Sequence, residues 1–331
     1  MVGAEGAFAK MHAASRCVSS RKPDEFVSRQ PAAKAFSRVN PTILGMLYAV
    51  AAGFILCFLN IILRLLTEGL PPFEVQFLRY LMGLVAVLPW VFRDGIAAYA
   101  TRSFSSQLLR GAIHASGLYL WFAALPLIPF SELIAISFTS PIFIMIGAVI
   151  FLKEAMFWQR WAAAVLGFLG VLVVVWPGLT GGSSNGGNWG SLLMLASSPL
   201  FAASFLITKA LARRDAPTVI VAWQALTVTL FTLPAALLDW HWPTPWQWAI
   251  ALLCGVLGSL GHWFLTHAYK LADISTAQPV KFLDMIWAAA LGYIFLAEIP
   301  STSTMLGAAV IFLSTTWIAR VEARRARSTP A

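Results

Sequence analysis

Lys281 and Asp284 are charged residues in a stretch of the sequence that is otherwise largely apolar. A charged side chain at the centre of a bilayer costs about 3 kcal/mol on insertion scales, so such residues commonly mark a site. Their spacing of three places both on one side of a helix, and Gln278 extends that side by one turn. The ammonium of Lys281 suits a carboxylate or phosphate, and the carboxylate of Asp284 suits an ammonium or a proton. The alternative is a neutralised ion pair that only fixes helix packing.

The depth of this pair follows from helix geometry. At a rise of about 1.5 Å per residue, a span that starts at Ile274 carries Lys281 roughly 10 Å and Asp284 roughly 15 Å deep, the latter near the bilayer centre. Pro279 cannot donate a backbone hydrogen bond, which frees a carbonyl oxygen for a ligand or an ion. The sequence therefore predicts a site at mid-membrane depth.

Four other side chains in apolar stretches are candidates for lining the same site. His262 can shuttle protons near neutral pH; it lies about 140° around the helix from His267, which disfavours a metal site. Asn60 lies one helical turn from Arg64 on the same side of its helix, and it is the better candidate of the two for lining the site. Trp121 and Trp287 can stack a flat substrate, although packing is the default interpretation of each.

A further group of charges is expected to gate or brace the molecule. Arg79 is free to pair with Glu74 or Glu132 as an outer gate, to bind an anionic substrate, or to hold the structure together. Glu154 and Glu298 occupy equivalent positions at the ends of two spans, on opposite membrane sides. A single site cannot use both, so a structural role at the adjoining loops is favoured.

The elements that position these residues are predicted to be transmembrane helices. Of the 331 residues, 59% are hydrophobic and 11% are charged, against about 25% charged in soluble domains. The apolar runs are continuous rather than alternating, which favours helices over a barrel. We expect an all-α integral membrane protein with ten spans, at residues 43–66, 73–92, 107–127, 131–152, 157–177, 189–211, 218–238, 248–270, 274–296 and 301–320.

The second half of the sequence repeats the first. A shift of 144 residues pairs Phe138 with Phe282, and a shift of 145 pairs Arg64 with Lys209 and Pro89 with Pro234. Five spans is an odd number, so the halves insert in opposite directions, as in transporters with a site at the junction of inverted repeats.

The same register identifies polar groups opposite the charged pair. The counterpart of Leu283-Asp284-Met285 is Thr139-Ser140-Pro141, which offers hydroxyls and a helix break. We therefore expect Ser137 and Ser140 to face Lys281 and Asp284 across the site.

Basic residues set the orientation of the spans. The chain has 23 lysines and arginines. If the N-terminus is inside, all of them fall in cytoplasmic segments apart from three, Arg64, Arg79 and Lys281, which lie within spans. Both termini are therefore predicted to be cytoplasmic. This distribution accounts for the net charge of +9 without a nucleic-acid partner.

The domain organisation follows from the repeat. We expect a basic disordered cytoplasmic tail at 1–42, a five-helix repeat at 43–178, a flexible linker at 179–189, a second five-helix repeat at 190–320 and a basic cytoplasmic tail at 321–331. The small-xxx-small spacing of Ala163 and Gly167 brings helices close, either in a homodimer or within the monomer.

The paired segments Phe151-Leu-Lys-Glu154 and Phe295-Leu-Ala-Glu298, each followed nine residues later by a small residue, make the sequence resemble the EamA family of the drug/metabolite transporter superfamily. Arg79-Tyr-Leu-Met-Gly83 also fits the pattern, and the resemblance covers about residues 43–322. Gln224 departs from it, since it replaces the arginine at the repeat equivalent of Arg79. The resemblance implies a cavity lined mainly by the third, fourth, eighth and ninth helices.

These observations together predict an inner-membrane secondary transporter of a small metabolite. Alternating access is expected, coupled to protons or run as an exchanger or exporter. An amphoteric metabolite with a flat group fits the charged pair beside aromatics: an aromatic amino acid, a nucleoside derivative or a flavin. The sequence holds no HExxH motif and no multi-histidine cluster, so an integral membrane enzyme is the weaker alternative, as is a non-transport scaffold. The only partners expected are the substrate, the lipid bilayer and a second copy of the chain, with no cofactor or metal.

Overall fold

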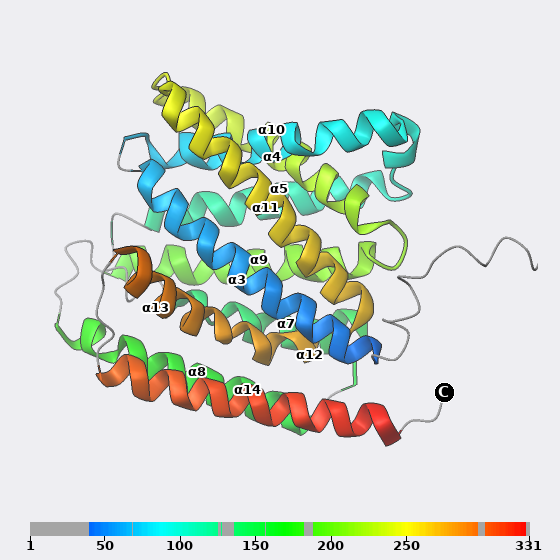
Figure 1. Cartoon of the computed structure of the whole chain (residues 1–331), viewed down its shortest axis with the longest axis vertical. Helices are drawn as coiled ribbons and strands as arrows, with labels where there is room; N and C mark the ends of the chain where they lie inside the picture. The colour runs from blue at the N-terminus through cyan, green and yellow to red at the C-terminus, as the bar shows by residue number, and fades with distance from the viewer. Residues whose placement is uncertain are drawn as a thin grey trace, which may run out of the picture. The chain divides into compact units, whose positions relative to one another are not determined.

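The regular elements of this computed structural model are all helical in the part of the chain that it describes. The described residues are 40–67, 69–124, 127, 136–155, 157–181, 188–296 and 302–328. They belong to one unit that begins at Asn40 (Figure 1). The predicted all-α class is confirmed.

The α-helices in these ranges are α3 (Pro41–Thr67), α4 (Pro72–Asp94), α5 (Phe104–Ala124), α7 (Ser140–Leu152), α8 (Trp158–Gly181), α9 (Asn188–Leu211), α10 (Pro217–Leu238), α11 (Pro245–Leu271), α12 (Ile274–Lys281), α13 (Leu283–Leu296) and α14 (Thr302–Ser328), with one 3-10 turn, η2 (Ile96–Tyr99). Six of them are long and apolar enough to cross a membrane, and shorter apolar helices lie at Ser140–Leu152 and Trp158–Val173. The α12–α13 pair occupies the ninth predicted span as one interrupted helix.

Proline and capping side chains explain where several helices begin. Pro72, Pro217 and Pro245 stand in the first turns of α4, α10 and α11, where the missing N–H removes no helical hydrogen bond. Thr244 and Gln247 form a reciprocal capping box at the start of α11, which satisfies two otherwise unpaired backbone donors.

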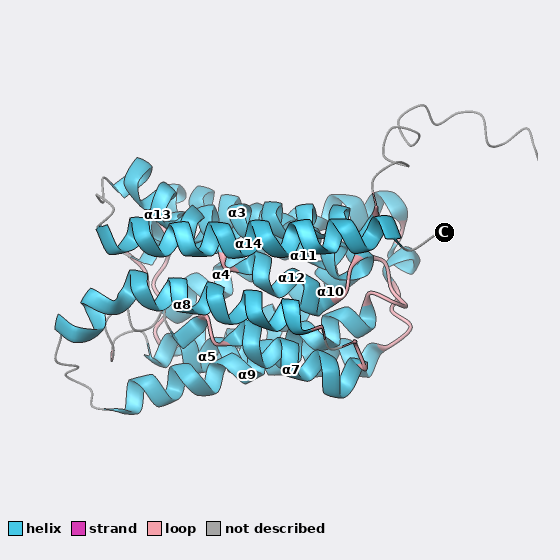
Figure 2. Cartoon of the chain, turned by 90° about the horizontal axis from the view of Figure 1, so that it is seen from below, coloured by secondary structure: helices cyan, strands magenta, loops and turns pink. Residues whose placement is uncertain are grey.

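Contacts between the two halves dominate the packing. Helix α3 packs against α11, and the repeat-equivalent helices α9 and α5 pack against each other in the same way. Helices α4 and α10, and α8 and α14, are equivalents that contact one another directly, and α7 of the fourth predicted span packs on α12 of the ninth; Figure 2 shows α8 and α14 side by side. Exchanging the halves therefore reproduces the main contacts, as expected for two units related by a two-fold axis.

One aromatic pair marks this axis. Phe138 and Phe282, equivalent under the shift of 144, stack with ring centroids 5.7 Å apart and an interplanar angle of 18°. The Cα of Gly167 lies against the Phe282 ring, where a Cβ would collide, and the carbonyl of Ala163 accepts a hydrogen bond of 2.8 Å from Ser314. The small-xxx-small surface is thus used within the chain.

Three helix ends extend past the expected domain boundaries. Helix α8 runs to Gly181 and α9 starts at Asn188, so both ends of the expected linker are helical; residues 182–187 lie outside the described ranges. Helix α14 continues to Ser328, well into the expected basic tail, because Glu322 is buried and paired with Arg160.

Three of the basic side chains that the orientation count assigned to cytoplasmic segments are buried among the helices. Arg110, Arg160 and Lys209 are at most 7% exposed. Each lies within a helix and bonds to a neighbouring element rather than to water.

Close packing of α11 against α4 gives a first prediction. Gly255 faces Met82 and Gly83, and an added Cβ would lie 2.7 Å from the Met82 Cβ and closer still to backbone. We expect Gly255→Val to lower stability by about 1–3 kcal/mol, as overpacking typically does. The measurement is the thermal midpoint of the purified protein in detergent. Leu253→Val, at an exposed position of the same helix, is the control, and an equal loss in both would contradict the close contact.

Candidate functional site

The helix break between α12 and α13 carries the charged pair predicted from the sequence. Helix α12 ends at Lys281, Phe282 forms the turn, and α13 begins at Leu283. The Lys281 Nζ lies 2.6 Å from Asp284 Oδ2, with the two side chains 19% and 20% exposed. The predicted ion pair is therefore formed, and it bridges the break without being sealed from its surroundings.

Helix α3 approaches this pair closely because it presents a glycine. A Cβ on Gly53 would overlap the Asp284 carboxylate. The Cys57 thiol, one turn further on, donates to the Asp284 carbonyl oxygen at 3.3 Å. Asn60 lies two turns from Gly53 on the same side of α3, and its side chain is exposed. Asn60 is thus placed along the helix face that borders the pair.

Trp287 adds an aromatic surface next to the charges. It follows Asp284 by three residues on α13 and packs edge-on against Phe54, with centroids 5.6 Å apart. Its indole N–H is buried and has no partner among the described residues. A buried donor without a partner calls for an explanation such as a ligand. Trp121, by contrast, packs against Phe122 at 4.9 Å in a separate cluster.

The break in the first half lies opposite. Helix α7 begins at Ser140, after a turn at Phe138 and Thr139. The Thr139 hydroxyl lies 2.6 Å from the Ile136 carbonyl and 3.0 Å from the Ser198 hydroxyl.

The two breaks are in contact, because α7 packs on α12 and Phe138 stacks on Phe282. Ser137 and Ser140 flank the turn that precedes α7 and are half-buried. They thus lie on the interrupted span predicted to face Lys281 and Asp284.

Gln278 is occupied within its own helix. Its amide donates to the Ile274 carbonyl at 3.0 Å, and the side chain is 1% exposed. The start of α12 is held by Glu154, whose carboxylate accepts from the Ile274 N–H at 2.9 Å and from the Ser275 N–H and hydroxyl at 3.1 and 2.6 Å. A carboxylate at a helix N-terminus matches its unpaired donors and its dipole. This is a structural arrangement of the kind expected at this loop.

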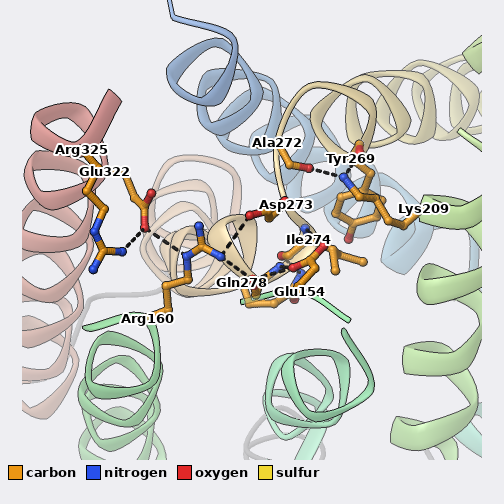
Figure 3. A network of polar contacts seen from close by, with 11 residues as sticks. Glu154, Arg160, Lys209, Tyr269, Ala272, Asp273, Ile274, Gln278, Glu322 and Arg325 are labelled. Atoms are coloured by element: carbon orange, nitrogen blue, oxygen red, sulfur yellow. Dashed lines mark hydrogen bonds and ion pairs between the residues drawn. The ribbon is translucent and has the colours of Figure 1, made fainter. Parts of the chain in front are cut away.

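The same end of the molecule contains a wider polar network (Figure 3). Arg160 donates to Ser275 at 2.8 Å and pairs with Asp273 at 3.2 Å and Glu322 at 3.0 Å. Lys209 donates to the Tyr269 and Ala272 carbonyls at 2.6 and 2.5 Å, which satisfies the C-terminus of α11. The network ties α8, α9 and α14 to the connection between α11 and α12, and so closes this end.

Arg79 does not make the gate pair that we considered with Glu74. Glu74 is buried at the start of α4 and accepts from the His241 N–H at 2.9 Å. Glu132 and Glu298, the other proposed gating or structural charges, lie outside the described residues. Arg79 instead lines a small cavity between α4, α10 and α11 together with His262.

Beside His262 lies a chain of hydrogen-bonded side chains. The spacing of these residues in the sequence did not predict it. The His262 ring lies 6.0 Å from His114 and 6.5 Å from Tyr80. His114 is bonded to the Tyr80 hydroxyl at 2.9 Å and to Ser204 at 3.1 Å. These partners come from four helices, so the sequence predicted a role for His262 but not the hydrogen-bonded chain beside it.

Comparison with known proteins adds a family to this geometry. Residues 43–176 and 188–320 each match the model of the EamA-like transporter family. A riboflavin transporter of Rhizobium johnstonii is 34% identical over 86% of this chain and 94% of its own length. One of Vibrio cholerae is 30% identical over 86% and 95%, and an S-adenosylmethionine uptake transporter of Rickettsia felis is 29% identical over 78% and 86%.

A solved crystal structure shares the fold. It covers 87% of this chain and 99% of its own, with a TM-score of 0.72 and 18% identity.

The ion pair at the helix break generates a second prediction. Asp284→Asn leaves the Lys281 ammonium without its partner, and we expect a loss of about 3 kcal/mol, as for other broken buried pairs. The double variant Lys281→Met/Asp284→Asn is expected to recover much of this loss, because no unpaired charge remains. Thermal midpoints without added substrate measure both. Asp94→Asn breaks the exposed pair with Arg93 and serves as control, with a change below about 1 kcal/mol. A double variant less stable than the single one would contradict the coupling.

Proposed function

The chain belongs to the EamA-like transporter family, and we propose that its substrate is a flavin, riboflavin in the first place. It is a multi-pass protein of the inner membrane that transports a small metabolite, as its relatives do. The resemblance drawn from the repeated Phe-Leu-x-Glu segments is thereby confirmed.

The observation that carries the flavin proposal is the unpaired indole N–H of Trp287 beside the Lys281–Asp284 pair. The isoalloxazine ring of riboflavin is flat, with carbonyl acceptors and one imide N–H, and its ribityl chain carries hydroxyls. The Trp287 N–H and the Lys281 ammonium are donors for the ring carbonyls, and Asp284 is an acceptor for the imide. Ser137 and Ser140 on the facing break are suited to the ribityl hydroxyls. The ring itself would lie against Trp287 and Phe54.

The electrostatics of the interior favour a flavin over S-adenosylmethionine, which carries a sulfonium and an ammonium. The cationic side chains around the buried His262 are Arg79, Arg110 and Lys281, and the carboxylate of Asp284 pairs with the last of them. A low-dielectric interior with this excess repels a cation. Riboflavin is neutral at pH 7 and avoids the repulsion.

We further propose ten membrane spans in two inverted five-helix halves, with both termini cytoplasmic. The exchange of contacts between the halves supports this arrangement. The described connections also gather at two ends: Thr101 bonds to Asp215 at 2.5 Å at one end, and the His241 N–H bonds to Glu74 at the other. On this orientation, the network around Glu154 and Arg160 closes the cytoplasmic end. Transport then proceeds by alternating access, with Asp284 as the proton carrier.

Transport of labelled riboflavin into proteoliposomes tests the substrate. We expect saturable uptake that unlabelled riboflavin competes for and S-adenosylmethionine does not. Asp284→Asn should reduce uptake at least tenfold and flatten its pH dependence, since it removes both an acceptor and the titrating group. Asp94→Asn, on the exposed end of α4, should leave uptake unchanged. Competition by S-adenosylmethionine without competition by riboflavin would overturn the proposal.

Reporter fusions test the arrangement of the spans. Alkaline phosphatase fused after Ser328 is expected to be inactive, and green fluorescent protein at the same point fluorescent, because that end is cytoplasmic. Phosphatase fused after Asp239, in the connection between α10 and α11, is expected to be active. The opposite pattern would invert the proposed orientation, and activity at both points would contradict the span count.

A further inference from the structure

The small cavity beside Arg79 lies where the two halves meet. Arg79 on α4 and Gln224 on α10 both line it, and they are repeat equivalents under the shift of 145. The next pair in the register, Tyr80 and Ala225, also lines it. Two pairs of equivalent residues around one space place that space on the axis that relates the halves.

Buried donors without partners surround the cavity. Arg79 Nε and Gln224 Nε2, on two of its lining residues, are buried and unbonded among the described residues, as is the neighbouring Arg110 Nε. The hydrogen bonds of Arg110 set the orientation of the Gln224 side-chain amide. Arg110 donates one N–H to the Ile220 carbonyl at 3.0 Å and another to Gln224 Oε1. Because the amide oxygen faces Arg110, the amide NH₂ has to face away from it.

Negative charge is missing from this surface. No aspartate or glutamate occurs among the described residues that line the cavity. Of its other polar groups, Ser259 donates its hydroxyl to the Gly83 carbonyl at 3.2 Å, and His262 lies beside Tyr80 and His114. Arg110 is buried, and Arg79 is half-buried with its guanidinium over the Tyr80 ring. Two cations so close to each other without a carboxylate are unfavourable unless an anion compensates them.

The size of the space limits which anion fits. The cavity has a volume of about 10 Å³, which is at the lower limit for one water. A single monatomic ion larger than water, such as a halide, therefore enters only if the half-buried Arg79 side chain moves slightly outward. A phosphate group or the carboxylate of a metabolite needs more room. We propose that this cavity is a binding site for a small monovalent inorganic anion, chloride, held by the Arg79 guanidinium and the Gln224 amide. The bound ion would offset the positive charge between α4 and α10 and so hold the two halves together.

Thermal unfolding of the purified full chain, without flavin, tests the site. Sodium chloride is exchanged for sodium gluconate at constant ionic strength, so that only the anion changes. We expect the midpoint to rise by about 2–4 °C when chloride exceeds its dissociation constant tenfold. Bromide should act like chloride, and sulfate, which is too large, should act like gluconate.

Two variants locate the effect. Gln224→Glu places a fixed carboxylate next to Arg79 and Arg110, so we expect a folded protein with a midpoint at least equal to that of the original and a chloride response weakened at least tenfold. Arg79→Gln removes the cation and should also abolish the response. Arg93→Gln, at the exposed end of the same helix, is the matched control and should respond as the original chain does.

Equal midpoints in chloride and gluconate would overturn the proposal, as would a chloride response that persists in both Gln224→Glu and Arg79→Gln. Stabilisation by sulfate as well as chloride would also overturn it, because it would indicate a surface effect. The measurement contains no flavin, so its failure leaves the substrate proposal standing. Conversely, a failed riboflavin assay with an intact chloride response would leave the anion site standing.

Discussion

A lipid bilayer offers no water to a buried polar group, so the chain has to pair almost every such group internally. Glu154 and Lys209 show how this is done at the two ends of one connection. The first supplies acceptors to the N-terminus of α12 and the second supplies donors to the C-terminus of α11. A chain can interrupt its helices in the membrane only if such partners come from other helices. The broken ninth span therefore depends on residues more than 60 positions away in the sequence.

Buried polar groups that have no hydrogen-bond partner in the described part of the chain are informative for the same reason. Trp287, Arg79 and Gln224 keep buried donors unbonded in the described part of the chain, and each stands next to other polar or charged side chains. In water such groups would be unremarkable, because solvent would satisfy them. In this setting they indicate where something other than the chain completes the structure.

The sequence predicted what depends on local pattern. Apolar runs defined the helices, the register of 144 aligned Phe138 with Phe282 before any contact was known, and the spacing of Lys281 and Asp284 predicted their pairing. What it could not predict depends on partners far along the chain. Arg160 and Lys209 lie near span ends, so a count of basic residues placed them in loops, although each is bonded to carbonyls, hydroxyls or carboxylates of other helices. Likewise, nothing in the spacing of Tyr80, His114 and Ser204 joins three helices in one hydrogen-bonded chain.

The position of a residue relative to the two-fold axis decides whether its surroundings can change during transport. In an alternating-access cycle of inverted repeats, the halves exchange conformations. In the proposed cycle, residues that line the axis, such as Arg79 and Gln224 or Phe138 and Phe282, would keep each other as neighbours in both states. These positions are therefore suited to a contact that stays fixed during transport, or to an ion that stays bound throughout. Lys281 and Asp284 have no charged equivalents in the first half, where the matching helix carries hydroxyls. In the proposed cycle their surroundings would change when the halves exchange, so the affinity of this pair for a proton or a substrate would differ between the two states. A ligand or proton drives a conformational change only through such a difference, which makes the off-axis pair, and not the axial cavity, the element able to couple binding to transport.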